Sequence, residues 1–145
     1  MKILSILLLA FFLRTSPPVW IHDLDAAMQQ ARTEHKHILL NFSGSDWCGP
    51  CIRMHKEIFE SEVFSRFASP NLVLVNADFP RNKKNQLPDP QRRLNDALAE
   101  KYNPRGIFPY TLLLDSEGNI IDKWEGFHQA GAEDFTAILK SDMVR

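Results

Sequence analysis

Cysteine and net charge are both scarce in this sequence of 145 residues, which has two cysteines and a formal net charge of −1. A small secreted fold held together by disulfides needs more cysteines, spaced so that they close long loops. Cys48 and Cys51 enclose only two residues, and so short a loop constrains the unfolded chain very little. The pair is therefore better explained by chemistry than by stability. The small net charge excludes the large basic field typical of nucleic-acid binding, and we expect no nucleic-acid partner.

The sequence also lacks a hydrophobic run long enough to span a membrane. The apolar run at residues 3–13 is short, whereas a membrane-spanning helix needs about 20 residues. A basic start at Lys2 followed by such a run is typical of a secretory signal peptide, although residues 14–18 offer no clean small-x-small cleavage site. An uncleaved N-terminal membrane anchor or a buried first element are the alternatives. We expect residues 1–16 to be a signal peptide or anchor, residues 17–145 to form one domain, and the protein to be periplasmic or otherwise extracytoplasmic.

Alternating helix and strand patterns along the chain predict an α/β fold with a mixed sheet. The predicted strands cover residues 38–42, 71–78, 111–115 and 120–125. The predicted helices begin after Asp23, at the two cysteines, after Ser61, at Asp89 and shortly before Phe135. Residues 116–119 have the composition of a hairpin turn, so the last two strands are expected to be antiparallel.

Two of the predicted helices have a clear start signal and an apolar face. Asp23 is expected to cap the first helix. The apolar face of that helix is predicted to consist of Leu24, Ala27, Met28 and Ala31. Asp89 is expected to cap a later helix, with Pro90 at its first helical position. The inner face of that helix is predicted to consist of Leu94, Ala97, Leu98 and Tyr102.

Cys48 and Cys51 stand where a predicted strand and loop lead into a helix. At a helix N-terminus, free backbone N–H groups and the macrodipole favour an anion and lower the pKa of a thiol toward neutrality. Cys48 can then attack a disulfide, and Cys51, one helical turn on, can release the product from the mixed disulfide. Gly49 and Pro50 allow a tight turn into the helix and set the spacing of the pair.

Residues 46–51, Asp-Trp-Cys-Gly-Pro-Cys, closely resemble the active-site segment of thioredoxins, and residues 105–115 resemble the cis-proline segment of that family. The resemblance implies a thioredoxin-like fold, with a central mixed sheet flanked by helices and ending in an antiparallel hairpin and a C-terminal helix. It also implies that the Phe108–Pro109 bond is cis and that Pro109 faces the cysteines, where the backbone pairs with a substrate chain. The approach to Cys48 and residues 78–80 are most similar to exported bacterial members.

The resemblance implies a thiol–disulfide oxidoreductase in which Cys48 and Cys51 are catalytic. We expect its substrate-binding surface to consist of Trp47, Gly49, Pro50, Phe108 and Pro109, with Trp47 as a partly exposed platform and Phe108 near the rim. The favoured activity is reduction of disulfides in exported proteins, with disulfide oxidase and isomerase as alternatives. The expected partners are disulfide-containing proteins and an unidentified electron donor. We expect a monomer without a cofactor, because the cysteine pair is itself the redox group.

Two positions depart from the thioredoxin pattern. The buried acidic residue that thioredoxins usually carry on the strand before the active site is matched by Asn41, which cannot titrate. The lysine often paired with that acid is matched by Leu74. The absence of both the acid and the lysine is consistent, because either one alone would be a buried charge without a partner. The group that takes the proton of Cys51 stays open, with Glu57, Asp46 and water as candidates.

The five histidines raise a different function, a thioredoxin-fold protein that binds or delivers copper. A zinc or copper site needs three or four converging ligands. His55 follows Cys48 by seven residues, or about 10 Å along a helix, so one helix cannot bring both to one ion. His35 and His37 are interpreted as solvent-facing, and His128 as a loop residue. We expect no metal site.

Two further polar features are interpreted as structural. Asp78 is interpreted as a residue at a strand end and nothing more. Arg81, Lys83 and Lys84 are interpreted as part of a solvated loop, which could also help to choose a partner.

Overall fold

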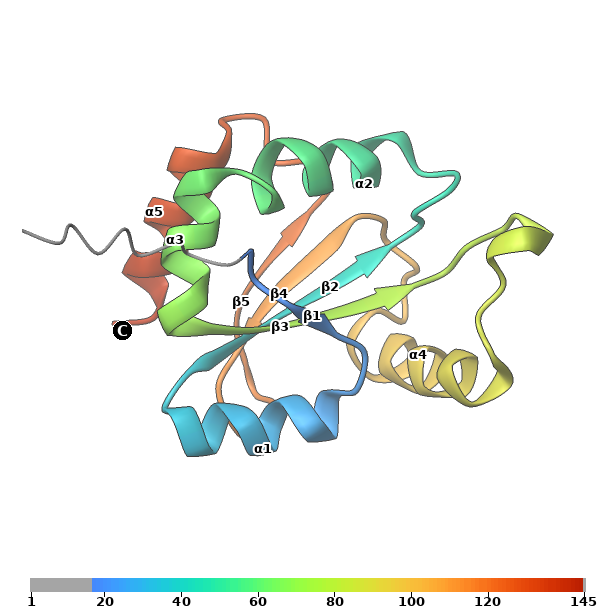
Figure 1. Cartoon of the computed structure of the whole chain (residues 1–145), viewed down its shortest axis with the longest axis horizontal. Coiled ribbons are helices and arrows are strands. Elements are labelled where there is room, and N and C mark those ends of the chain that lie inside the picture. Colours follow the sequence, from blue (N-terminus) through green and yellow to red (C-terminus); the bar gives the residue numbers. More distant parts are fainter. Residues whose placement is uncertain (1–16, 145) are drawn as a thin grey trace, which may run out of the picture.

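The predicted strands and helices form one sheet with helices on both faces in the computed structural model, which describes residues 17–144 (Figure 1). The strands are Trp20–Ile21 (β1), His37–Ser43 (β2), Leu72–Asp78 (β3), Tyr110–Leu114 (β4) and Ile120–Glu125 (β5). The α-helices are Leu24–Glu34 (α1), Gly49–Arg53 (α2), Glu62–Asn71 (α3), Asp89–Tyr102 (α4) and Ala132–Asp142 (α5). A π-helix, Met54–Phe59 (η1), continues α2, and a short 3₁₀ turn, Lys83–Asn85 (η2), lies in the loop after β3.

The sheet is mixed, as the sequence predicts. The strand order is β1-β3-β2-β4-β5, with β1 and β2 both parallel to β3. The second half of the sheet is antiparallel, since β4 runs against β2 and β5 against β4. The α/β fold class and the closing hairpin and helix are therefore confirmed.

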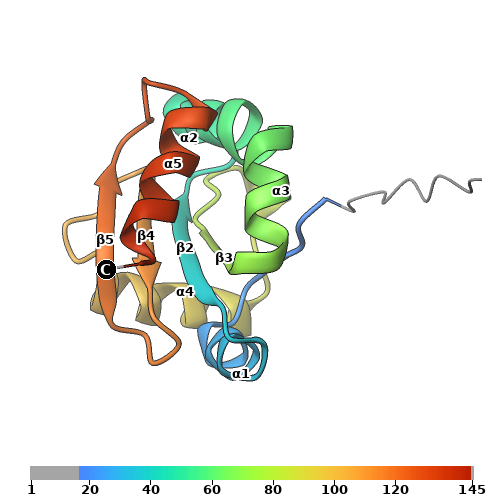
Figure 2. The same ribbon diagram turned by 90° about the vertical axis from the view of Figure 1, so that its left-hand side faces the viewer.

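Side chains along each strand point alternately to the two faces of the sheet, so the core consists of two apolar layers. On β2, Ile38, Leu40 and Phe42 face the layer of α1 and α4, whereas Leu39 faces the layer of η1, α3 and α5. Figure 2 shows α1 and α4 below the sheet, with α2, α3 and α5 on the opposite face. Since Asn41 follows Leu39 by two residues, it shares the face that α2 covers.

The predicted signal peptide or anchor, residues 1–16, lies outside the described residues. Among residues 17–144, no helix combines the length and the apolar character that crossing a membrane requires.

The two predicted helix caps have different outcomes. Asp23 caps α1 as expected, and its carboxylate accepts hydrogen bonds from the N–H groups of Asp25 at 2.9 Å and Ala26 at 3.2 Å. The prediction for Asp89 is wrong, because α4 begins at Asp89 itself, after Pro88. Inside the first turn the Asp89 carboxylate forms an ion pair with Arg92 and places negative charge at the positive end of the helix.

The predicted inner face of α4 is only half right. Tyr102 is buried and Leu98 is half-buried, but Leu94 is 44% exposed and Ala97 is exposed as well. The helix instead turns Asn95 inward, where its side-chain amide donates to the Asp78 carbonyl at 2.9 Å. A specific hydrogen bond to the end of β3 therefore sets the rotation of α4, which an apolar pattern does not reveal.

We expect Asp23→Ala to lower the free energy of unfolding by about 1 kcal/mol, because two N–H groups in the first turn of α1 lose their acceptor. Urea unfolding at neutral pH measures the change. Asp25→Ala is the matched control, since it removes an acidic side chain from the same turn without removing the cap. Equal losses in the two variants would contradict the capping assignment.

Candidate active site

Cys48 and Cys51 form a disulfide at the point where the chain leaves β2 and enters α2, with their Cα atoms 5.2 Å apart. Cys48 is the N-cap of α2, and both cysteines are buried. The N–H of Cys51 donates to Cys48 Sγ at 3.2 Å, and the N–H of Gly44 donates to Cys51 Sγ at 3.5 Å. A helix N–H directed at the first sulfur is an arrangement that stabilises a thiolate there after reduction.

Trp47 is half-buried, directly precedes Cys48, and is fixed by contacts of its indole ring. Its Nε1 donates to the carbonyl of Phe79 at 2.7 Å, and the Arg81 guanidinium lies 3.6 Å from the ring centroid. The ring also packs against Gly44, where an added Cβ would lie 2.3 Å from the indole. Glycine is therefore required at position 44, and Trp47 is a rigid, partly exposed surface next to the disulfide.

The cis-proline segment, residues 105–115, contacts the cysteine segment, residues 46–51, through aromatic side chains. The Phe108 ring lies 5.5 Å from the ring of Trp47 and 5.5 Å from that of Phe79, both edge to face. The Phe108–Pro109 peptide bond is cis, the isomer that the resemblance implies. Pro109 is buried at the start of β4, and its carbonyl accepts a hydrogen bond from Gly126 at 2.9 Å.

The five predicted substrate-binding residues thus fall into two groups. Trp47 and Phe108 are in contact at the rim, and Gly49 and Pro50 are exposed as the first two residues of α2. Pro109, the residue after Phe108, is buried. The role of these five residues in substrate binding stays a prediction.

Asp78 has a larger part in the site than the sequence suggested. Its carboxylate accepts hydrogen bonds from the N–H of Ser45 at 2.9 Å and from Ser45 Oγ at 2.5 Å. It therefore ties the loop that leads to Cys48 to the end of β3. The interpretation as a strand-end residue and nothing more is wrong. The contact follows from the parallel pairing of β2 with β3, which brings the segments after both strands to one edge of the sheet and which the sequence did not reveal.

Asp46 ties the same loop to the segment after β3. Its carboxylate accepts from the N–H groups of Arg81 and Asn82, each at 2.9 Å, and from the side-chain amide of Asn85 at 3.0 Å. The hydrogen bond from Arg81 and then that from Asn85 lower the pKa of Asp46.

Asn41, at the position where thioredoxins usually carry an acid, belongs to a hydrogen-bonded network of uncharged side chains. Asn41 is buried, and its amide donates to Asn76 Oδ1 at 3.1 Å while its Oδ1 accepts from Thr111 Oγ1 at 3.1 Å. The three residues are register partners on β3, β2 and β4. Leu74 is buried in the apolar layer on the same face. The network is satisfied without any charge.

A cavity of about 410 Å³ adjoins Cys51, and two histidines line it that sequence reasoning did not connect with this cysteine. Its polar lining includes Asn41, Ser43, Ser45, His22, His55, Lys56 and Asn76. His55 follows Cys51 by four residues, a spacing that puts two helical residues on one face and could have been noticed. Neither Asp46 nor Glu57 lines the cavity, and Glu57 forms a surface ion pair with Arg53 at 2.8 Å.

The remaining histidines are dispersed. His35 is exposed at the end of α1, His37 is half-buried rather than solvent-facing, and His128 lies 2.7 Å from a carboxylate oxygen of Asp134. Within residues 17–144, no three side chains of His, Cys, Asp or Glu are grouped so that they could hold a metal ion.

Comparison with known proteins identifies similar sequences over most of the chain. A family model described as Thioredoxin-like matches residues 19–116. The disulfide bond reductase DsbH of Chlamydia pneumoniae is 37% identical over 115 residues, which cover 79% of this chain and 67% of DsbH. The thioredoxin-related protein DsbJ of the same organism is 31% identical over 130 residues, but these cover 81% of this chain and only 35% of DsbJ.

Solved structures with the same fold include a DsbH oxidoreductase, at a TM-score of 0.79 and 34% identity over 88% of this chain and 85% of that one. A thioredoxin from Thermus thermophilus matches at a TM-score of 0.66 and 16% identity, over 89% of each chain. At that identity the likeness supports the fold alone. The thioredoxin-like fold predicted from the two motifs is confirmed.

We expect Asp46→Asn to make stability less dependent on pH in acid. The pKa of Asp46 lies below its ordinary value of 3.8, so its carboxylate contributes stability that is present above that value and lost as the pH falls through the lowered pKa. The free energy of unfolding should therefore fall less in the variant than in the wild type between about pH 5 and pH 2. Urea unfolding across this range measures both slopes.

Asp96→Asn is the control for this experiment. Asp96 is exposed on α4, and its side chain makes no hydrogen bond or ion pair with any other residue in the range 17–144. Its variant should keep the slope of the wild type. The same slope in all three proteins would contradict the assignment to Asp46.

Proposed function

The chain belongs to the thioredoxin-like family and is a thiol–disulfide oxidoreductase, and from this premise we propose that it reduces disulfides of exported proteins through Cys48 and Cys51. The observation that carries the proposal is the Cys48–Cys51 disulfide at the start of α2, with a helix N–H directed at Cys48 Sγ. The rim formed by Trp47 and Phe108 lies beside it and supports the entry of a substrate chain at this point.

The first step is nucleophilic attack by the Cys48 thiolate of the reduced protein. The thiolate attacks one sulfur of a substrate disulfide, so that an S–S bond forms between Cys48 and the substrate and the substrate's own S–S bond breaks. The departing substrate sulfur leaves as a thiolate and takes up a proton. The N–H of Cys51 stabilises the negative charge on Cys48 Sγ before attack.

The second step releases the substrate. Cys51 loses its proton and attacks Cys48 Sγ, which forms the intramolecular disulfide and expels the second substrate thiolate, again followed by protonation. The substrate has then gained two electrons and two protons, and the protein has lost them. An electron donor, itself a dithiol or thiol reductant, returns the protein to its reduced state.

Two observations support the reducing direction. The Cys-Gly-Pro-Cys sequence is that of reducing thioredoxins, and the relative at 37% identity is named a disulfide bond reductase. An exported location is supported by the basic start and apolar run of residues 1–16, which act as a signal peptide or membrane anchor in this proposal. In an oxidising compartment the dithiol needs a dedicated donor, because the surroundings drive it toward the disulfide.

We expect Cys48→Ser to abolish the acceleration of insulin reduction by dithiothreitol, because the thiol at the start of α2 is lost and the remaining thiol, Cys51, is buried inside the helix. Cys51→Ala should still form the mixed disulfide but should fail to resolve it, so that covalent complexes accumulate on non-reducing gels. The turbidity assay for insulin measures the first effect. Full activity in Cys48→Ser, or complexes trapped by Cys48→Ser rather than Cys51→Ala, would contradict the assigned order.

The reduction potential tests the direction. Equilibration of the Cys48–Cys51 couple with a reference thioredoxin of known potential should place it near that of thioredoxin, about −270 mV. A reductase needs so negative a value because electrons must flow from it to substrate disulfides. A value near that of strongly oxidising couples, about −120 mV, would show that the protein acts as an oxidase instead.

A further inference from the structure

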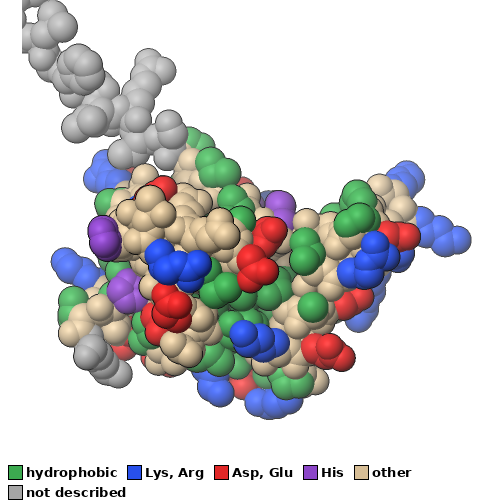
Figure 3. All heavy atoms as spheres, turned by 90° about the horizontal axis from the view of Figure 1, so that it is seen from below, with side chains coloured by type: hydrophobic (Ala, Val, Ile, Leu, Met, Phe, Trp, Pro, Cys, Tyr) green, Lys and Arg blue, Asp and Glu red, His purple; other side chains and the backbone are tan. Residues whose placement is uncertain are grey.

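The loop between β3 and α4 is a concentration of positive charge beside the site. Residues 79–88, which we call the basic loop, contain Arg81, Lys83 and Lys84 and no acidic residue. The whole chain has a net charge of −1, so a loop of +3 leaves −4 for all other residues. Figure 3 shows Lys and Arg side chains gathered on the projecting end of the molecule, where this loop lies.

The basic loop is fixed to the segment that carries the cysteines. Asp46, two residues before Cys48, accepts hydrogen bonds from two N–H groups and one side-chain amide of the loop. The carboxylates of Asp46 and Asp78 offset two positive charges, since Asp78 accepts a hydrogen bond from the loop N–H of Phe79 at 3.0 Å, and the loop together with both has a charge of +1. Trp47 donates to the loop carbonyl of Phe79, and Arg81 lies over the ring of Trp47.

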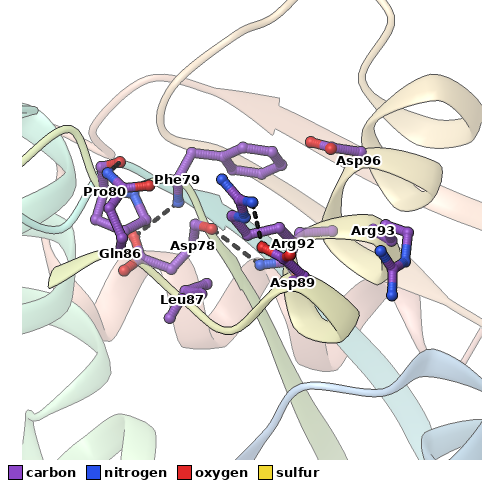
Figure 4. A pocket seen from close by; sticks show the side chains of 10 residues that line it. Asp78, Phe79, Pro80, Gln86, Leu87, Asp89, Arg92, Arg93 and Asp96 are labelled. Carbon is purple, nitrogen blue, oxygen red and sulfur yellow. Dashed lines mark hydrogen bonds and ion pairs between the residues drawn. The ribbon is translucent and has the colours of Figure 1, made fainter. Parts of the chain in front are cut away.

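Internal hydrogen bonds hold the loop in one shape. The side-chain amide of Gln86 donates to the carbonyl of Pro80 at 3.0 Å, and Asn82 Oδ1 accepts from the N–H of Lys84 at 3.0 Å. In Figure 4, Pro80 and Gln86 lie together at one end of a pocket of about 430 Å³. The charged side chains of α4 that line this pocket do not neutralise the loop, because they have no net charge: two are acidic and two basic, namely Asp89, Asp96, Arg92 and Arg93.

The two lysines of the loop have no counter-charge. Lys83 and Lys84 are exposed in η2, and neither has an ion pair with any residue in the part of the chain that the structure describes. Arg81 is committed to Trp47, which is in contact with Phe108 across the rim. The positive charges therefore continue the rim formed by Trp47 and Phe108 on the side of the basic loop, which its internal hydrogen bonds already hold in place.

We propose that the basic loop is a docking surface for acidic side chains that lie next to the disulfide of a protein substrate. The inference rests on the proposed function, since it concerns which disulfides reach Cys48. Complementary charge increases the rate of encounter more than it increases the affinity. The effect must weaken with salt, because charges are screened over about 8 Å at physiological ionic strength.

Two disulfide-bonded peptides of equal length test the proposal, one with glutamates and one with lysines flanking the cystine. The pre-reduced wild type should reduce the acidic peptide about 10-fold faster than the basic one at low salt, and the ratio should approach one in about 0.5 M salt. Lys83→Glu combined with Lys84→Glu should abolish or reverse the ratio. Its rate with the uncharged disulfide 2,2′-dithiodipyridine should be that of the wild type, because the dithiol is unchanged.

Lys123→Glu combined with Lys140→Glu is the matched control, with the same change of charge on exposed residues of β5 and α5. It should keep the ratio of the wild type. Equal rates of the wild type with both peptides, or an equal shift in the control, would overturn the inference while leaving the proposed function intact. Equal peptide rates together with loop-dependent cosedimentation with anionic lipid vesicles would assign the loop to a membrane surface instead. Failure to reduce either peptide would overturn the proposed function, and the inference with it.

Discussion

The parallel pairing of β2 with β3 is the constraint on which the site depends. Because the two strands point the same way and are paired from His37 to Ser43, the segments that follow them leave the sheet at the same edge. One segment becomes the approach to Cys48, and the other becomes the basic loop. Asp46 and Asp78 each lie on one segment and accept hydrogen bonds from the other. The disulfide is thus supported by two loops that hold each other.

Trp47 joins the parts of this edge that are distant in sequence. Its indole contacts Gly44, Phe79, Arg81 and Phe108. An aromatic side chain can do this because it offers two faces, an edge and one N–H donor. The consequence is that the surface beside the disulfide is formed before any substrate arrives, so that little ordering remains to be done on binding.

The sheet beneath the disulfide is polar but uncharged. Thr111, Asn41 and Asn76 satisfy one another across three strands, and no buried carboxylate has to be paired. Titratable side chains near Cys51 lie instead in the adjoining cavity, where His22 and His55 are in contact with solvent. The cavity beside Cys51 thus has a polar lining without a carboxylate, whereas a thioredoxin keeps an acid on the strand.

Sequence patterns predicted a feature correctly where that feature depends on interactions between residues close together in the chain. The strands, the Asp23 cap, the hairpin at residues 116–119 and the cysteine pair at a helix start follow from spacing and turn chemistry, and the two motifs together predicted the fold. The errors lie where distant segments meet. Leu94 and Ala97 were misassigned to the inner face of α4 because a hydrogen bond from Asn95 to the end of β3 sets the rotation of that helix.

The sequence by itself thus determined the fold class and the redox chemistry, since both depend on residues close together in the chain or on motifs of fixed order. Only the tertiary structure decided what surrounds the cysteines. The hydrogen bonds of Asp46 and Asp78 and the position of Arg81 over Trp47 depend on the packing of strand ends and loops. Side-chain contacts across more than thirty residues leave no periodic signal in a single sequence, because any polar residue at a loop position satisfies the same local pattern.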